Sequence, residues 1–257
     1  MKSKMNLKIS LKELLNMPVS PYEKYHEKTK IRKFAKSDFS QKGVPEEWKT
    51  VYFKGYGRLA EIMLPKPDPL AKELLRDALK NRKSSREFGK EKLPLTKLST
   101  LLFYSAGLRV HTSSWTGNRF YPSGGSRYPL EVYFLSLKAQ LPCGLYHYYL
   151  KNHSLESLLK EDKLDLKKYF NQDWIADASG LIIISAVFKR MTMKYKDRGY
   201  KHIMIEAGHL GQNIYLLSAA LNLNCCAIGG FVDDKLNELL DVDGISESVV
   251  YVIAIGC

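Results

Sequence analysis

Apolar residues recur at helical spacing in three stretches of the chain, and each stretch predicts a helix. The first begins at Asp68-Pro69, where an aspartate cap precedes a proline in the first turn, and continues through an apolar stripe to Leu79. The second carries the leucines of residues 95–102, and Gly107 is placed to end it. The third, residues 200–222, is apolar on most of its faces, which is typical of a helix buried in a core.

Between the second and third helices the pattern changes to that of β-strands. Residues 131–137 and 144–149 are β-rich runs separated by a turn, and residues 181–188 are almost all apolar, as in a central strand buried on both faces. A short strand ending at Gly229-Gly230, a helix over residues 233–240 and a last strand over residues 249–255 follow the long helix. This order predicts an α+β fold in which a central mixed β-sheet is flanked by helices.

The first part of the chain differs from the rest in pattern and in charge. Residues 1–65 are largely irregular, with one short predicted helix near residues 11–17, and we interpret them as a basic N-terminal arm before a folded domain of residues 66–257. Of the net charge of +13, a surplus of 12 lies in residues 1–100. The lysines alternate with acidic residues and lack interleaved aromatic residues, so we expect a solvated surface and no nucleic-acid partner.

The composition and the apolar pattern also argue against a membrane-spanning, secreted or disulfide-bonded protein. No apolar run approaches the roughly 18 residues of a membrane span, and the N-terminus has no apolar signal-peptide core. The four cysteines form no CxxC pair and no disulfide framework. We therefore expect a reduced, cytoplasmic protein with no membrane partner.

Three segments could carry chemistry. Residues 82–86, Arg-Lys-Ser-Ser-Arg, place guanidinium, ammonium and hydroxyl groups where a phosphate could bind, although basic residues also suit a helix C-terminus. The loop of residues 121–129 and the segment of residues 227–231 each contain a Gly-Gly pair that lets backbone approach a flat ligand. The loop of residues 121–129 has neither the spacing of a P-loop nor that of a dinucleotide fingerprint, and either segment alone is compatible with an ordinary turn.

His202, Glu206 and His209 share one face of the third helix and could in principle hold a metal. Their spacing is not that of a zinc protease, and no fourth ligand is suggested nearby. Hydrogen bonding inside a buried helix is the favoured interpretation, so we expect no metal. The nucleophile elbow GxSxG and a paired-cysteine redox motif are both absent from the sequence.

Taken together, these segments resemble the FMN-dependent nitroreductase superfamily, and in particular its SagB-type branch, the azoline dehydrogenases of thiazole/oxazole-modified peptide biosynthesis. The matching stretches follow the family's order over roughly residues 70–257: Arg82–Phe88, Pro122–Val132, Gly144–Tyr149 with the later His153, Lys194–Tyr200, Glu206–Asn213 and Ala227–Phe231. The resemblance implies a nitroreductase-like fold and a homodimer with FMN bound at the interface between the two chains.

The resemblance also implies roles for individual residues. The segment expected to hold the FMN phosphate, ribityl chain and pyrimidine edge is Arg82, Lys83, Ser84 and Arg86. The loop expected to approach the flavin, in many members from the other chain, is Pro122, Ser123, Gly124, Gly125 and Ser126. The backbone expected to face flavin N5 is Ile228, Gly229 and Gly230. Lys194 and Tyr195 match the lysine-tyrosine pair implicated in azoline oxidation.

One departure from the family concerns the phosphate. Many simple nitroreductases continue past the last strand and supply a basic phosphate ligand there, whereas this sequence stops at Cys257. The phosphate is therefore expected to rely on Arg82 and Lys83 or on another basic residue.

The expected reaction is the FMN-dependent oxidation of peptide azolines to azoles, with loss of a proton and a hydride. Lys194 would act as the base, favoured in its neutral form by burial and by nearby Lys196 and Arg198, and Tyr195 would relay or orient the proton. The expected partners are a modified precursor peptide and a cyclodehydratase complex. Two alternatives remain open: a general NAD(P)H-dependent nitro- or quinone-reductase, and a non-catalytic scaffold subunit of a peptide-modification complex.

Overall fold

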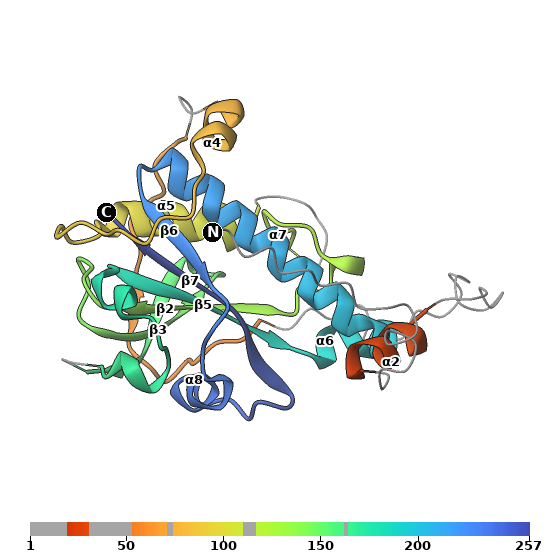
Figure 1. The fold of residues 1–257 in the computed structure, drawn as a ribbon. Helices are drawn as coiled ribbons and strands as arrows, with labels where there is room; N and C mark the ends of the chain where they lie inside the picture. The colour runs from red at the N-terminus through yellow and green to blue at the C-terminus, as the bar shows by residue number, and fades with distance from the viewer. Residues whose placement is uncertain (1–19, 31–52, 71–73, 110–116, 162–163) are drawn as a thin grey trace, which may run out of the picture. The chain divides into compact units, whose positions relative to one another are not determined.

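The structure is a computed structural model that describes residues 20–30, 53–70, 74–109, 117–161 and 164–257 (Figure 1). The chain divides into two units, residues 1–43 and 44–257. The described part of the first unit is helix α2 (Pro21–Lys28), which begins with a capping box between Ser20 and Glu23. The helix predicted near residues 11–17 lies outside the described residues.

A seven-stranded sheet forms the centre of the second unit, in the order β1-β4-β3-β2-β5-β7-β6. The strands are β1 (Glu61–Met63), β2 (Leu130–Ser136), β3 (Gly144–Tyr149), β4 (Ser154–Lys160), β5 (Gly180–Val187), β6 (Asn224–Ile228) and β7 (Glu247–Gly256). Every pairing between these strands is antiparallel, so the predicted mixed sheet is wrong. The apolar run in β5 reflects burial on both faces, and helices on both sides of an antiparallel sheet produce the same pattern.

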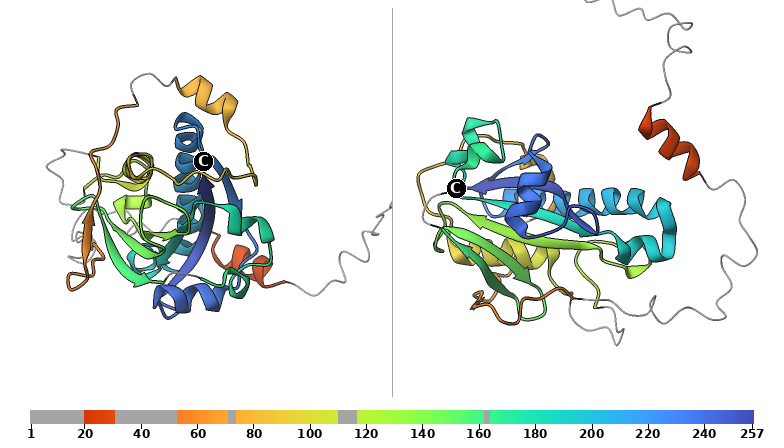
Figure 2. Two further views of the ribbon diagram at one scale, coloured as in Figure 1. Left: turned by 90° about the vertical axis from the view of Figure 1, so that its left-hand side faces the viewer. Right: turned by 90° about the horizontal axis from the view of Figure 1, so that it is seen from below.

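Helices cover both faces of this sheet (Figures 1 and 2). Along β2, Val132 and Phe134 join the hydrophobic cluster under α5 (Leu95–Ala106) and α7 (Gly199–Ala220). Tyr133 and Leu135, which point the other way, join the cluster under α8 (Asp233–Leu240) and the short helical turn Asp173–Asp177. The α+β class is confirmed, and α5, α7 and α8 follow the predicted spans closely.

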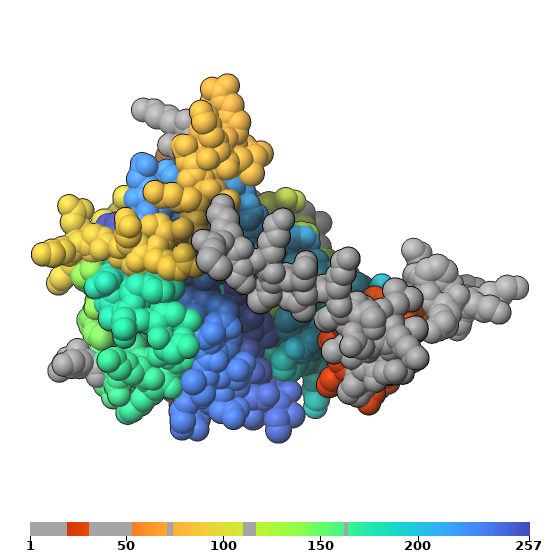
Figure 3. Space-filling view, viewed as in Figure 1, coloured from red at the N-terminus to blue at the C-terminus, as the bar shows by residue number. Residues whose placement is uncertain are grey.

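The first predicted helix begins later than its sequence pattern indicates. Helix α4 covers Leu75–Asn81, whereas residues 64–70 have no helical structure. The backbone N–H of Asp68 donates to Thr100 Oγ1 on α5 at 2.9 Å, so this segment is tied to α5 instead of starting a helix. Of the predicted apolar stripe, only Ala78 is buried within α4, while Leu75 and Leu79 are 68% and 53% exposed. Figure 3 shows α4 projecting from the surface of this unit.

Within the described residues, the structure contains no helix that is long and apolar enough to cross a membrane.

Candidate functional site

Lys194 and Tyr195 lie at the C-terminal end of a short helix, α6 (Lys189–Tyr195). Both side chains are half-buried, and the Lys194 ammonium lies 5.5 Å from the centre of the Tyr195 ring. A Cβ added to Gly125 would lie 2.7 Å from Lys194 Nζ and 2.6 Å from Tyr195 Oη. The structure therefore brings the lysine-tyrosine pair directly against the predicted flavin-approaching loop, at a position where a φ of 60° favours glycine.

The loop of residues 122–126 has a conformation that needs support. Gly125, Ser126 and Tyr128 all have positive φ angles, of 60°, 54° and 44°, and the last two are not glycine. The Ser123 hydroxyl accepts from the Tyr128 N–H at 2.8 Å and donates to Glu206 Oε2 on α7 at 2.7 Å. These two hydrogen bonds attach the loop to the long helix.

Glu206 is a residue for which sequence analysis had proposed only internal hydrogen bonding. Its side chain is buried, and burial raises the pKa of its carboxyl group to about 8, while the Ser123 hydrogen bond and the Arg119 charge oppose that shift. The two histidines that were considered with Glu206 as metal ligands lie in different surroundings. The centre of the His202 ring lies 4.9 Å from that of the Tyr195 ring, whereas His209 is exposed. The described residues contain no group of three or more His, Cys, Asp or Glu side chains that could hold a metal ion.

A buried network of ion pairs and hydrogen bonds connects α6 to the sheet and to the end of the glycine loop. Arg190 Nη1 donates to Glu131 Oε1 on β2 and to the Tyr128 carbonyl, and the Arg190 carbonyl accepts from Arg127 Nε at 3.1 Å. Glu131 Oε2 lies 3.1 Å from Nε2 of the fully buried His147. The same network thus ties α6, the end of the glycine loop and the centre of the sheet together, and it was not predicted from the sequence.

The segment of residues 82–86 lies elsewhere, beside the C-terminal part of α7. The Arg82 guanidinium lies 5.5 Å from the centre of the Tyr215 ring, and the Ser84 hydroxyl is 3.0 Å from the Tyr215 hydroxyl. Lys83 and Tyr215 line a hollow of about 290 Å³ next to the start of β6. Tyr215 is a binding-site candidate that sequence analysis missed, since a tyrosine on a buried helix reads as a core residue.

Arg86 is placed apart from Arg82 and Ser84. Its guanidinium lies 5.9 Å from the centre of the Trp174 ring, and Trp174 packs against the hydrophobic cluster on the opposite face of the sheet from Tyr215.

The Gly229-Gly230 segment lies next to the same part of α7. The Ala227 N–H donates to the Tyr215 hydroxyl at 2.8 Å, which connects the end of β6 to Ser84 through one shared side chain. Ile228 is buried, whereas Gly229 and Gly230 are exposed. A Cβ on Gly229 would meet no atom within 4 Å, so its backbone borders open space.

Apart from Arg86, the predicted site residues therefore form two clusters within one chain. The loop cluster comprises Pro122–Ser126, Lys194, Tyr195 and Glu206, and the arginine cluster comprises Arg82–Ser84, Tyr215 and Ile228–Gly230. Glu206 and Tyr215 are nine positions apart on the same helix, a separation of about 13 Å along its axis.

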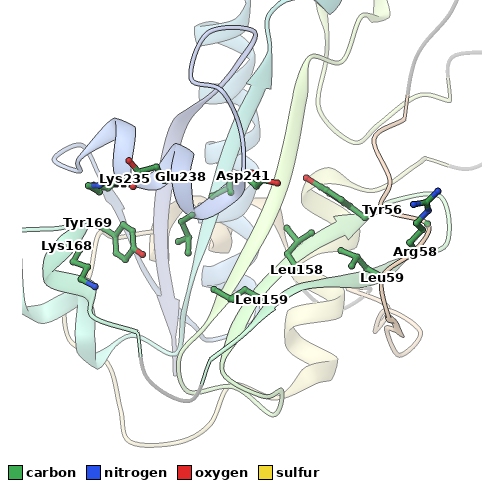
Figure 4. A pocket seen from close by; sticks show the side chains of 13 residues that line it. Tyr56, Arg58, Leu59, Leu158, Leu159, Lys168, Tyr169, Lys235, Glu238 and Asp241 are labelled. Carbon is green, nitrogen blue, oxygen red and sulfur yellow. Dashed lines mark hydrogen bonds and ion pairs between the residues drawn. The ribbon is translucent and has the colours of Figure 1, made fainter.

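A further hollow, of about 1090 Å³, lies on the α8 side of the sheet (Figure 4). Its lining includes Tyr56 and Leu59 from the segment before β1, Leu158 and Leu159 of β4, and Glu238 of α8. None of the site residues predicted from the sequence lines it, although it is much larger than the hollow beside Lys83.

Comparison with known proteins assigns the family. The profile of the nitroreductase family matches residues 79–257, and the chain belongs to this family. It is 34% identical over 190 residues to MJ1384 of Methanocaldococcus jannaschii, a protein named as a nitroreductase, which covers 72% of this chain and 92% of that protein. A solved structure of a similarly named protein from Ralstonia eutropha covers 76% of this chain and 88% of its own, with 30% identity and a TM-score of 0.65.

The chain is also similar to peptide-processing proteins. It is 25% identical over 180 residues to the microcin B17-processing protein McbC of Escherichia coli, which covers 63% of this chain and 66% of that protein. A chain in the solved E. coli microcin synthetase McbBCD complex, with truncated pro-MccB17 bound, matches over 98% of both chains with a TM-score of 0.59. At 18% identity, this second likeness shows the fold alone.

Proposed function

We propose that this protein is an FMN-dependent oxidoreductase that converts azoline rings in a modified peptide to azoles. The observation that carries the proposal is the contact of Lys194 and Tyr195 with Gly125, because it places a candidate base and its partner at the glycine loop. Membership of the nitroreductase family supports the flavin chemistry. The similarity to McbC, named for microcin B17 processing, supports the peptide substrate.

The arginine cluster has the chemistry to hold FMN. Arg82 and Lys83 supply cationic donors for the phosphate, and Ser84 with Tyr215 supplies hydroxyl groups. The open space at Gly229 leaves room for a flat ring to approach the backbone. These residues fit the cofactor, and Arg82 and Lys83 are the proposed ligands of its phosphate.

We propose that the complete site combines the arginine cluster of one chain with the loop cluster of a second copy. Within one chain the two clusters are separated by about 13 Å along α7. Leu75 and Leu79 are exposed on α4, immediately before Arg82, so an apolar surface adjoins the arginine cluster. A two-fold dimer that covers this surface would bring the two clusters together twice.

In the proposed reaction, Lys194 removes the proton from the azoline carbon next to the carbonyl group. Bound FMN supplies the acceptor for the hydride that leaves the neighbouring ring carbon. Tyr195 orients the Lys194 amine and the substrate through its hydroxyl group. Burial raises the pKa of Tyr195, so its phenol stays protonated and able to donate near neutral pH.

A second candidate function is the reduction of nitro compounds or quinones with NAD(P)H. It is favoured by the similarity to MJ1384, which exceeds the similarity to McbC in identity and coverage. Oxidation of NAD(P)H by the purified protein without any peptide would identify this activity. Turnover of a heterocyclised peptide without NAD(P)H would identify azoline oxidation, the activity proposed first.

The proposed macromolecular partners are the precursor peptide and a cyclodehydratase complex. The likeness to a chain of the microcin synthetase complex supports this proposal at the level of the fold. A flavin-free protein that still copurifies with such a complex would instead support a scaffold role.

Replacement of Arg82 by alanine is expected to reduce FMN binding strongly. The purified wild-type protein should be yellow, with about one FMN per chain, because a charge-assisted phosphate contact is among the strongest hydrogen bonds in proteins. Loss of that contact and of the packing on Tyr215 should lower affinity by roughly 10- to 100-fold, measured by quenching of flavin fluorescence. Arg58→Ala, on an exposed arginine beside the hollow on the α8 side, is the matched control. A colourless wild-type protein that FMN cannot reconstitute would refute the cofactor assignment.

Mixing two inactive variants tests whether the site is shared between chains. Arg82→Ala lacks a phosphate ligand and Lys194→Ala lacks the base, but a mixed dimer would contain one site with both residues intact. After unfolding and refolding together, the mixture should recover about a quarter of the wild-type azoline oxidation, since half of the dimers are mixed and half of their sites are complete. Absence of any recovery, or a flavin-loaded monomer in sedimentation, would place the whole site within one chain.

A further inference from the structure

Arg190 connects the helix that carries the proposed base to the rest of the protein. It is the second residue of α6, it lies four positions before Lys194, and it is 7% exposed. Its Nη1 atom donates to Glu131 Oε1 on β2 and to the Tyr128 carbonyl, which lies 3.2 Å away. Residues four positions apart share one face of a helix, so Arg190 and Lys194 both face the glycine loop.

The backbone of Arg190 is bonded as well as its side chain. Its carbonyl oxygen accepts from Arg127 Nε at 3.1 Å. In an α-helix the same carbonyl accepts from the N–H four residues later, which here is that of Lys194, and its two lone pairs serve both donors. Arg127 therefore binds the peptide group that also accepts the Lys194 N–H.

The end of the glycine loop is held through Tyr128. This residue has a φ angle of 44°, which is strained for a tyrosine. Its N–H donates to the Ser123 hydroxyl at 2.8 Å, and its carbonyl accepts from Arg190. Both polar groups of the Tyr128 backbone are thus bonded, one within the loop and one to α6. Arg190 therefore connects the loop to the helix that carries the base.

The acceptor on the sheet is held in place by two further strands. Glu131 Oε2 lies 3.1 Å from Nε2 of His147 on β3, and His147 Nδ1 lies 2.7 Å from Glu156 Oε2 on β4. All three side chains are at most 5% exposed. Hydrogen bonds have a preferred direction, so a fixed carboxylate defines where the guanidinium lies. Glu131 thus fixes Arg190 against the centre of the sheet.

The other buried side chain of α6 supplies contacts of a different kind. Among the seven residues of α6, Arg190 and Met191 are buried. Met191 packs in the hydrophobic cluster under α5 and α7, and such apolar contacts do not depend on direction. The bonds of Arg190, in contrast, are directional.

We propose that Arg190 is a positioning residue for azoline oxidation: its bonds to Tyr128 and Glu131 set the distance between the glycine loop and the amine of Lys194. This inference rests on the proposed function for the role of Lys194 as the base. It assigns to Arg190 no contact with the substrate or with FMN. Misplacing a reacting group by about 1 Å slows a reaction by about 100-fold, so a residue that fixes such a distance has a large effect on turnover.

The reactivity of the Lys194 amine in the free protein, without flavin or peptide, tests the proposal. Acetylation by acetic anhydride is measured by mass spectrometry, with the exposed Lys167 as the internal reference. Arg190→Lys keeps the positive charge beside Glu131, but its side chain is shorter and ends in an ammonium group. We expect Lys194 to be acetylated about tenfold faster than in wild type, relative to Lys167, because loss of a hydrogen bond to a charged group opens the contact between Lys194 and the loop.

A second readout follows the other side of this contact. Hydrogen–deuterium exchange of the peptide that covers residues 122–128 should also become faster in Arg190→Lys, since Tyr128 loses its bond to α6. Lys54→Met is the matched control, because it also breaks a largely buried ion pair, that with Glu247. It should lower the stability while leaving both the acetylation of Lys194 and the exchange of the loop as in wild type.

Two outcomes would overturn the proposal directly. One is equal acetylation of Lys194 in wild type and Arg190→Lys, and the other is an equal increase in Lys54→Met, which would show a general loss of stability. If Arg190→Lys fails to fold, Glu131→Asp decides the question. Aspartate keeps the charge but withdraws the acceptor by one methylene group, so Lys194 should again react faster, and an unchanged rate in folded Glu131→Asp would overturn the proposal.

Turnover separates this inference from the proposed function. Arg190→Lys should lower kcat for azoline oxidation by about 10- to 100-fold, while KM for the peptide and the FMN content stay as in wild type. Wild-type kcat in this variant would refute only the inference. A wild-type protein that oxidises no azoline, but whose Lys194 reacts faster in Arg190→Lys, would refute only the proposed function.

Discussion

Lys194→Ala is expected to slow azoline oxidation by about 10²- to 10⁴-fold while FMN remains bound, since removal of a general base typically has an effect of this size. Lys194 belongs to the loop cluster and not to the arginine cluster proposed to hold FMN, which is the reason to expect retained flavin. Lys194→Arg should fail nearly as badly, because a guanidinium stays protonated and cannot accept the substrate proton. Tyr195→Phe should keep the ring beside His202 and lose the hydroxyl near Gly125.

A control on the same helix separates loss of the base from loss of structure. Lys189→Ala, on an exposed lysine of α6, should keep both FMN and the wild-type rate of azoline oxidation. Wild-type turnover by the Lys194 variants would place the base elsewhere, with Tyr200 and His209 as the next candidates. Loss of flavin together with activity would show that the lysine-tyrosine pair is structural.

Glu131→Leu is expected to lower the free energy of unfolding by about 3–5 kcal/mol at pH 7, the usual effect of removing one partner from a buried ion pair. It would leave Arg190 and His147 buried without their shared acceptor. Equilibrium unfolding in urea measures the change. Glu238→Leu, which breaks the exposed pair with Lys235, should change stability by less than about 1 kcal/mol.

The buried ion pair between Glu131 and Arg190 also predicts that the stability of the protein falls at acid pH. Burial alone would raise the pKa of Glu131, but the charge of Arg190 and the bond to His147 hold it down, at about 2. A carboxyl group with a depressed folded-state pKa stabilises the fold above its unfolded pKa, near 4.5, and loses that contribution as pH falls toward 2. The wild-type protein should therefore lose stability between pH 5 and 2, and Glu131→Leu should lose less. Equal acid sensitivity in both proteins would contradict this assignment.

The sequence by itself determined the elements whose signals are local. The leucine spacing that ends at Gly107 predicts α5, and the apolar repeat over residues 200–222 predicts the buried α7. The all-apolar run over residues 181–188 predicts the central strand β5. Such periodicities and caps depend on residues within one turn or one strand of each other, so the chain order alone contains them.

Features that depend on contacts between distant segments were decided only by the tertiary structure. Asp68 has the residue type of a helix cap, yet Thr100 takes its N–H and the helix begins at Leu75. Antiparallel pairing throughout the sheet follows from how the strands are connected, and the burial pattern of β5 is the same for either direction.

The candidate site shows the same division. The sequence singles out the glycine loop, the lysine-tyrosine pair and the arginine segment as separate stretches. Only the fold places Lys194 against Gly125, Ser123 on Glu206, and Arg82 on Tyr215 about 13 Å further along α7. The protonation states, backbone strain and ion pairs at these positions depend on burial and on contacts between segments that are far apart in the sequence, such as Ser123 and Glu206. Burial and such contacts arise only when the chain has folded.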